Sequence, residues 1–202
     1  MSRPALALLL LALFHAVAFG LRTWQHLRAT GTTGFHGISG RPGSAEWLGG
    51  VLFALGVALG LAAPLAELLG WVAPLWQPTP ACARLGALLG ALGVVATYLS
   101  QRSMGTAWRI GVLATERTRL VVRGPFAVVR NPIFTCMLLT ALGLAVLLPN
   151  VLAWAALACL FVAVELQVRL VEEPHLARLH GQAYRDYSAR VGRFVPGLGT
   201  RG

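Results

Sequence analysis

Long apolar runs alternate with short polar stretches along this chain. A helix that crosses a membrane needs roughly 20 mostly apolar residues, and about five segments reach this length, some with help from their flanks. We therefore predict an all-α fold, a polytopic transmembrane helical bundle of about five spans with a cytoplasmic amphipathic tail. The predicted spans are Ala5–Leu21, Trp47–Leu69, Ala81–Ser100, Pro132–Leu148 and Val151–Val168.

The last two spans are joined by a very short turn. Only Pro149 and Asn150 separate them, so they are expected to form a tight antiparallel helical hairpin. We divide the chain into an N-terminal region of three spans, residues 1–103, and a C-terminal region, residues 104–202. The C-terminal region holds the hairpin, the loop before it and the tail.

Small residues recur at four-residue spacing in two of the spans. Gly56 and Gly60 lie in the second span, and Gly86 and Gly90 lie in the third. This spacing lets two helix backbones approach closely inside a membrane. We interpret these glycines as helix-packing positions.

Composition agrees with a membrane protein. Of the 202 residues, 56% are hydrophobic and 12% are charged, whereas a soluble domain carries about 25% charged residues. The formal charge is +10, and every basic residue is arginine. A basic chain often binds nucleic acid, but these arginines flank apolar spans, which fits topology and lipid contacts better. The cysteines and histidines form no disulfide framework and no metal-binding pattern.

The arginines are unevenly distributed over the loops. The stretch between spans three and four and the tail carry six arginines each, and the first loop carries three. The second loop has only Arg84, and the N-terminus has only Arg3. Because basic loops stay in the cytoplasm, we predict a multi-pass integral membrane protein with the N-terminus outside and the C-terminus cytoplasmic. We expect it in a bacterial inner membrane.

The first apolar run has two interpretations. Arg3, an apolar core and Ala16-Val17-Ala18 resemble a signal peptide with its cleavage site. Phe14 and Phe19 fit poorly beside such a site, so we favour a retained helix. The loop that follows has glycines at three-residue intervals and is expected to be a flexible cytoplasmic loop that could line a substrate entrance. These glycines are Gly31, Gly34, Gly37 and Gly40.

A polar turn, Gly124–Phe134, leads into the fourth span. Its Gly-Pro pair favours a turn, Asn131 is a natural N-cap, and Pro132 fits the first helical turn, where a missing N–H costs nothing. These structural roles do not account for Arg130, which stands beside the cap at the membrane surface. Arg130 is therefore a candidate functional residue.

Charged residues also gather at the end of the fifth span. Glu165 and Arg169 are four apart, and Glu172 and Glu173 follow Arg169 by three and four positions. All four can share one helical face and neutralise each other. An ion-pair network and a functional site both fit this spacing. Location favours a site, because the hairpin brings Arg130 and Glu172 to the same membrane side, where buried charge is costly.

The tail that ends at Pro196 has an amphipathic pattern. It predicts a helix that lies on the membrane surface, or one that folds back as a lid over the site. The apolar stripe consists of Leu176, Leu179, Tyr184, Tyr187 and Val191.

Several short motifs follow one another between Met104 and Pro196. They are Trp108–Val112, Leu120-Val121 before Gly124-Pro125-Phe126, Val129–Phe134, Glu172-Glu173 with Leu176, Gly181, Tyr184 and Tyr187, and Arg193–Pro196. In their order and spacing this half of the chain resembles the isoprenylcysteine carboxyl methyltransferase family of integral membrane enzymes, which is related to the phospholipid N-methyltransferases.

The resemblance implies an S-adenosyl-L-methionine site at the cytoplasmic mouth of the hairpin and a lipid-like or prenylated substrate that enters from the bilayer. Arg169 and Glu172 would be catalytic, and Arg169 and Trp108 would contact the substrate. Membrane lipids are expected partners and nucleic acid is not. The residues expected at the cofactor are Leu120, Val121, Phe126, Arg130, Asn131, Pro132, Phe134, Glu172 and Glu173.

The implied reaction is carboxyl O-methylation of an isoprenylcysteine-like or isoprenoid substrate. The chain departs from the family pattern at Asn131, where histidine is usual, and at Phe126 and Phe134, where tyrosine is frequent. Phospholipid amines and small thiols therefore stay open as methyl acceptors. An NADPH-dependent lipid reductase and a non-catalytic membrane scaffold are the alternative functions.

Overall fold

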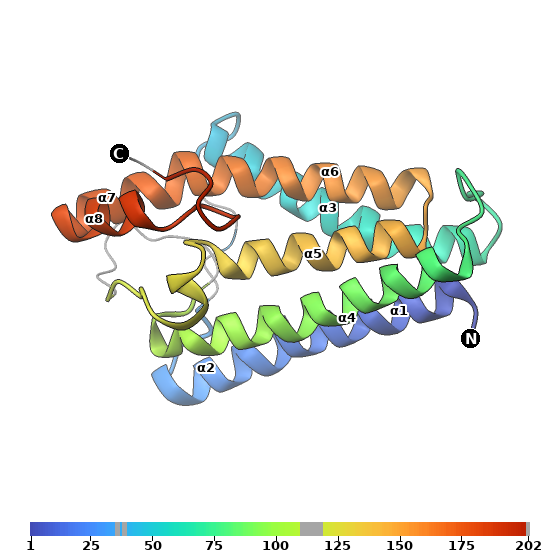
Figure 1. Ribbon diagram of the computed structural model, residues 1–202, viewed down its shortest axis with the longest axis horizontal. Coiled ribbons are helices and arrows are strands. Elements are labelled where there is room, and N and C mark those ends of the chain that lie inside the picture. The colour runs from blue at the N-terminus through green and yellow to red at the C-terminus, as the bar shows by residue number, and fades with distance from the viewer. Residues whose placement is uncertain (35–36, 38–39, 110–118, 201–202) are drawn as a thin grey trace.

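The structure, a computed structural model, describes residues 1–34, 37, 40–109 and 119–200. The regular secondary structure of these ranges is helical, and the long helices lie side by side along one axis (Figure 1). The predicted all-α fold is confirmed. The helices are α1 (Arg3–Phe14), α2 (Arg22–Thr30), α3 (Ala45–Leu68), α4 (Pro80–Ser103), α5 (Pro132–Leu147), α6 (Val151–Leu166), α7 (Glu173–His180) and α8 (Gln182–Arg190).

Two of the predicted spans are longer than the apolar pattern suggested. The π-helical turn η1 (His15–Leu21) joins α1 to α2, and the π-helical turn η4 (Gln167–Glu172) joins α6 to α7. Within the described ranges, 4 helical stretches are long and apolar enough to cross a membrane, and α5 is a shorter apolar helix. About five spans therefore fit the structure, as the sequence predicted.

The tight turn between α5 and α6 is organised by Asn150, which is fully buried. Its side chain accepts a hydrogen bond from the amide of Ala153 at 3.0 Å and so caps α6. Its amide nitrogen donates to Glu67 at 2.9 Å and to the Ala63 carbonyl at 3.3 Å, both on α3. The predicted hairpin is thus present and is tied to a third helix.

Glycines allow two helix pairs, α4 with α5 and α3 with α6, to pack closely. A Cβ atom added to Gly86 would stand 2.6 Å from the amide nitrogen of Leu147, and one on Gly143 would fall on the backbone of Gly90. A Cβ atom on Gly56 would meet a leucine side chain of α6 at 2.7 Å. These contacts agree with the packing role predicted for the glycines.

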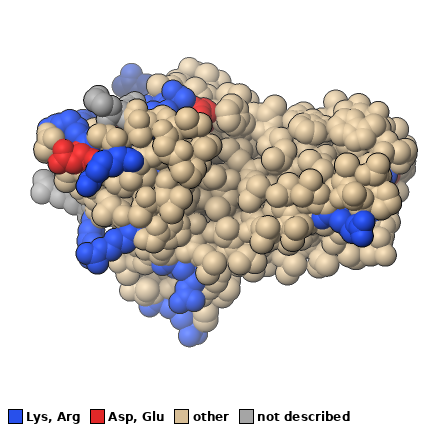
Figure 2. Space-filling view, in the orientation of Figure 1, with Lys and Arg blue, Asp and Glu red and all other residues tan. Residues whose placement is uncertain are grey.

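The two ends of the bundle differ in charge. The N-terminus and the α5–α6 turn lie at one end, and α2, α7, α8 and the C-terminus lie at the other (Figure 1). Arginines gather mainly at the second end (Figure 2). The first helix packs against α3 and α4, and its retention stays a prediction. The membrane orientation stays a prediction.

Candidate functional site

A cavity of about 470 Å³ lies at the arginine-rich end of the bundle. Helices α3 to α8 and the segments 104–109 and 119–121 contribute to its walls. It brings together most of the residues that the sequence predicted for a site. These are Trp108, Leu120, Val121, Phe126, Arg130, Asn131, Phe134, Glu172 and Glu173.

Two predicted residues lie outside the cavity lining. Arg169 pairs with Glu165, as the four-residue spacing predicted, but 52% of its side-chain surface is exposed. Pro132 is buried at the start of α5, where it serves the helix. The structure therefore gives Arg169 no position that faces the cavity. Ile110–Val112, part of the motif that begins at Trp108, lies outside the described residues.

Glu172 reaches the cavity because the helix widens into η4. In a π-helical turn, residues five apart lie above one another. Gln167 and Glu172 have this spacing, both line the cavity, and the Gln167 side chain donates to the Glu172 carboxylate at 3.4 Å. Such single-turn bulges occur frequently at functional sites. The wider turn also separates Glu172 from the ion pair of Glu165 and Arg169 on the preceding turn.

Glu173 has different partners from those that the spacing predicted. Its Oε1 atom accepts hydrogen bonds from Arg130 at 2.7 Å and from Arg193 at 2.8 Å. The prediction that Glu173 and Glu172 share one face with Glu165 and Arg169 is wrong, because η4 rotates the helix between them. Glu173 is 1% exposed, so its charge requires these two partners.

Arg130 fastens the C-terminal tail to the start of α5. Its Nη1 atom donates to the carbonyls of Ser188 at 2.8 Å and Val191 at 2.7 Å, and its Nη2 atom donates to Gly199 at 3.0 Å. These bonds pair the two terminal nitrogens of a buried guanidinium with three backbone oxygens and one carboxylate. Arg130 lines the cavity with these two nitrogens committed to the protein, whereas its buried Nε atom has no partner among the described residues.

Asn131 precedes α5 as predicted but does not cap it through its side chain. Its side-chain amide donates to the Arg193 carbonyl at 3.2 Å, and its backbone amide donates to the same oxygen at 3.1 Å. Asn131 therefore holds the tail rather than the helix end. The predicted side-chain cap of α5 is absent, and the side-chain nitrogen of Asn131 bonds to the tail instead.

The tail folds over the cavity as two short helices, α7 and α8, which meet at Gly181. Tyr184 and Tyr187 are buried and line the cavity. The Tyr187 hydroxyl donates to the Phe126 carbonyl at 2.6 Å. Burial raises the pKa of Tyr187 to about 12, although the nearby Arg130 opposes this shift. Of the two predicted tail arrangements, the structure favours the lid.

Trp108 forms another part of the wall and is held by α2. The guanidinium carbon of Arg22 lies 4.9 Å from the centre of a Trp108 ring, and the His26 ring meets Trp108 edge-on at 5.5 Å. Arg22 also donates to the Gly105 carbonyl. Gly34, one of the regularly spaced glycines, packs against His26, and Gly37 lines the cavity.

Sequence reasoning missed several polar residues of the cavity. Arg119 was counted only as a topology determinant, Arg109 was also part of the Trp108–Val112 motif but received no role, and Gln101 and Gln167 were not singled out. Gln167 is five positions before Glu172, a spacing that an ordinary α-helix does not place on one face, and the others come from elements other than η4. A polar residue just beyond an apolar run was the available signal. The cavity-lining polar residues that received no site role are Glu46, Gln101, Arg109, Arg119, Gln167 and His175.

Comparison with known proteins identifies the family of this chain. Residues 81–183 match the phospholipid methyltransferase family, and this range covers α4 to α7 together with most of the cavity residues. The cobalt-zinc-cadmium resistance protein CzcN of Cupriavidus metallidurans is 30% identical over 111 residues, which are 54% of this chain and 49% of that protein. The match thus spans about half the length of that relative. No solved structure matches significantly. The chain belongs to the phospholipid methyltransferase family.

Proposed function

We propose that this protein transfers a methyl group from S-adenosylmethionine to an amphiphile of the bilayer. The observation that carries the proposal is the cavity itself. It lies at the arginine-rich end of the bundle, within the segment that matches the family, and it combines acidic, basic and apolar walls. A cavity of about 470 Å³ is within the usual range of about 300–1,000 Å³ for small-molecule sites.

The charged side chains of the cavity suit the polar end of the cofactor. S-adenosylmethionine carries an ammonium, a carboxylate and a sulfonium, and when bound it supplies the methyl group. Glu172 can accept a charge-assisted hydrogen bond from the ammonium, because the hydrogen bond that its carboxylate accepts from Gln167 is long. Arg109 and Arg119 also line the cavity and can pair with the carboxylate.

The rest of the cavity excludes water and fixes positions. Phe126 and Phe134 offer apolar, aromatic surface, and Tyr187 holds the backbone of Phe126 through its hydroxyl. Methyl transfer depends on an in-line approach of the acceptor, so rigid walls contribute through orientation. Exclusion of water strengthens the electrostatic contacts of Glu172.

The orientation of the protein follows from its arginines. Because basic loops are retained in the cytoplasm, the end that holds the cavity faces the cytoplasm. An amphiphile in the cytoplasmic leaflet then has its head group at the depth of the cavity. A bacterial inner membrane fits this arrangement.

The methyl acceptor is less constrained than the donor. Carboxyl O-methylation of an isoprenylcysteine-like or isoprenoid substrate was expected to use Arg169, and that side chain lies outside the cavity. Arg109 and Arg119 keep a carboxylate acceptor chemically reasonable. An amine acceptor, as in phospholipid N-methylation, is the second candidate, and the family description favours it.

Cofactor binding tests the proposal and separates it from its alternatives. The purified chain in detergent is titrated with S-adenosylhomocysteine and, separately, with NADPH. Saturable S-adenosylhomocysteine binding is the expected result. Binding of NADPH alone would make the protein a reductase, and binding of neither would make it a scaffold. Incubation with methyl-labelled S-adenosylmethionine and a native lipid extract then identifies the acceptor from the labelled product.

A further inference from the structure

Gln101 is a buried polar side chain of the cavity that has no role in the proposed binding of the cofactor. It lies near the end of α4, is 3% exposed, and lines the cavity. Its Nε2 atom donates to the carbonyl of Ala18 at 3.0 Å. Its Oε1 atom is buried and has no hydrogen-bond partner among the described residues. An unpaired buried acceptor of this kind is costly unless a ligand satisfies it.

The orientation of this amide follows from chemistry. The Ala18 carbonyl can only accept a hydrogen bond, so the NH₂ group of Gln101 must face it. The carbonyl oxygen of the side chain then has to face away from Ala18. A flip of the amide would place two acceptors against each other. Gln101 therefore presents an acceptor, and not a donor, to whatever lies beside it.

Gln101 and Glu172 belong to different elements of the cavity wall. Gln101 belongs to α4, whereas Glu172 ends η4, which extends α6, and Figure 1 shows α4 and α6 on opposite sides of α5. The acidic group assigned to the cofactor and the unpaired amide oxygen are thus contributed by different helices. The α4 part of the wall is the one left for the second substrate.

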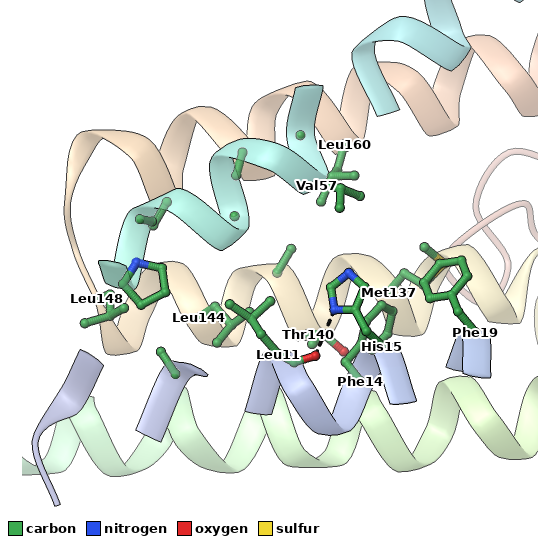
Figure 3. A pocket seen from close by; sticks show the side chains of 18 residues that line it. Leu11, Phe14, His15, Phe19, Val57, Met137, Thr140, Leu144, Leu148 and Leu160 are labelled. Carbon is green, nitrogen blue, oxygen red and sulfur yellow. Dashed lines mark hydrogen bonds between the residues drawn. The ribbon is translucent and has the colours of Figure 1, made fainter. Parts of the chain in front are cut away.

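Beside Gln101, the cavity adjoins a second, apolar cleft in the membrane interior. Phe19 and Met137 line both spaces, and Figure 3 shows them at one end of the cleft with Leu148 at the other. Phe19 follows Ala18, the residue that holds the Gln101 amide. The polar acceptor and the mouth of the cleft are therefore neighbours.

The cleft has the polarity of a hydrocarbon chain but room for only a short part of one. Its lining is almost entirely aliphatic and aromatic, and its volume is about 60 Å³. An apolar cavity that takes benzene measures about 150 Å³, so this cleft takes only the few carbons of a chain that lie nearest its head group. A polar head beside Gln101, with the start of its tail in the cleft, would be the natural pose of an amphiphile.

We infer that Gln101 is a specificity-determining residue: its Oε1 atom accepts a hydrogen bond from the head group of the methyl acceptor, whose tail enters the cleft between Phe19 and Met137. The inference rests on the proposed methyl transfer. It favours a head group that donates an N–H bond, as an amine does. A carboxylate has no donor and would meet the amide oxygen with its own oxygens.

Two ligands with the same tail and opposite heads test this role. Dodecylamine and dodecanoate are titrated into the full chain, in detergent and saturated with S-adenosylhomocysteine. The ratio of their two dissociation constants is compared among the wild type, Gln101→Met and Gln101→Glu. Methionine keeps the length of the side chain without the oxygen, and glutamate keeps an acceptor oxygen. Gln25→Met is the matched control, because Gln25 bonds to Tyr98 and does not line the cavity.

We expect Gln101→Met to lower the preference for the amine by about tenfold, since it removes one buried hydrogen bond. Gln101→Glu should keep that preference, and Gln25→Met should leave it unchanged. An equal ratio in Gln101→Met and wild type, or a wild type that prefers dodecanoate, would overturn the inference.

S-adenosylhomocysteine affinity, measured in the same variants, separates the two proposals. It should stay the same in Gln101→Met. A loss of S-adenosylhomocysteine affinity in Gln101→Met, with that variant still folded, would make Gln101 a contact of the cofactor instead of the methyl acceptor. A wild type that binds no S-adenosylhomocysteine would reject the proposed function itself.

Discussion

Arg193 donates two parallel hydrogen bonds to Glu173, from Nε to Oε1 at 2.8 Å and from Nη2 to Oε2 at 3.1 Å. Arg130 donates to Oε1 from the start of α5 at 2.7 Å. The hydrogen bonds between Arg193 and Glu173 raise the pKa of Arg193 above its ordinary value, so Arg193 stays protonated. One carboxylate thus joins the tail, α7 and α5 at the wall of the cavity.

The first prediction concerns this carboxylate. Glu173→Gln leaves two nearly buried guanidiniums without their counter-charge, and breaking a buried ion pair in this way costs about 3–5 kcal/mol. We expect a clear fall in the apparent melting temperature of the protein in detergent. Faster proteolysis beyond Val191 should accompany it, because Arg130 and Arg193 hold that segment.

Glu165→Gln is the matched control for the loss of one carboxylate. Glu165 pairs with Arg169, whose side chain is half exposed, and exposed pairs contribute no more than about 1 kcal/mol. Its melting temperature should stay close to that of the wild type. An equal fall in melting temperature in the two variants would show that the buried bonds of Glu173 to Arg130 and Arg193 contribute no more stability than an exposed ion pair.

The second prediction uses the buried hydroxyl of Tyr187. The Tyr187→Phe variant leaves the Phe126 carbonyl without its donor, which costs about 1–3 kcal/mol at neutral pH. The apparent melting temperature should therefore fall. Circular dichroism should show unchanged helix content, because the ring itself keeps its packing.

The same variant predicts a pH dependence with a definite sign. The pKa of Tyr187 is raised from 10.0 to about 12 in the folded protein. Stability from this group is fully present below pH 10.0 and is lost as the pH rises toward about 12, since the unfolded chain releases the proton first. Over this range the wild type should lose stability faster than Tyr187→Phe. Parallel curves would contradict the buried state of the hydroxyl.

The third prediction separates two residues that the sequence placed in one site. Glu172→Ala should weaken S-adenosylhomocysteine binding by at least about tenfold, because a charged hydrogen bond is lost. Arg169→Ala should leave the affinity within about twofold, since its side chain is exposed and paired with Glu165. Isothermal titration in detergent measures both. The reverse order of effects would restore Arg169 to the site and remove Glu172.

Much of the fold could be predicted from the sequence because a membrane dictates the length and polarity of the helices that cross it. The apolar runs located the spans, and the two-residue turn at Pro149 and Asn150 required a hairpin. The π-helical turns His15–Leu21 and Gln167–Glu172 were not predicted. A π-turn differs from an α-turn by one residue of register, and neither segment departs from an ordinary helical composition.

The site could be predicted only in part, because several of its contacts join residues far apart in the sequence. Motif order located the segments that meet at the cavity, so Glu172, Phe126 and Phe134 were expected there. Spacing rules see partners within one helix. Glu173 instead finds Arg130 and Arg193, which are 43 and 20 positions away along the chain. Such pairs depend on how the tail folds, and helical periodicity carries no information on that.

The fourth prediction tests whether close backbone approach holds the bundle together. Gly143→Ala places a Cβ atom on the backbone of Gly90 and 2.7 Å from the Gly86 carbonyl oxygen, so α4 and α5 must separate. Overpacking of this kind costs about 1–3 kcal/mol. Alanine gains up to about 1 kcal/mol of helix propensity over glycine, so the steric cost should win. Gly60→Ala is the matched control: its Cβ atom would meet only the Ala156 side chain, at 3.9 Å. There the propensity should win, and the apparent melting temperature in detergent should hold or rise. A Gly143→Ala variant as stable as Gly60→Ala would mean that α4 and α5 separate without loss.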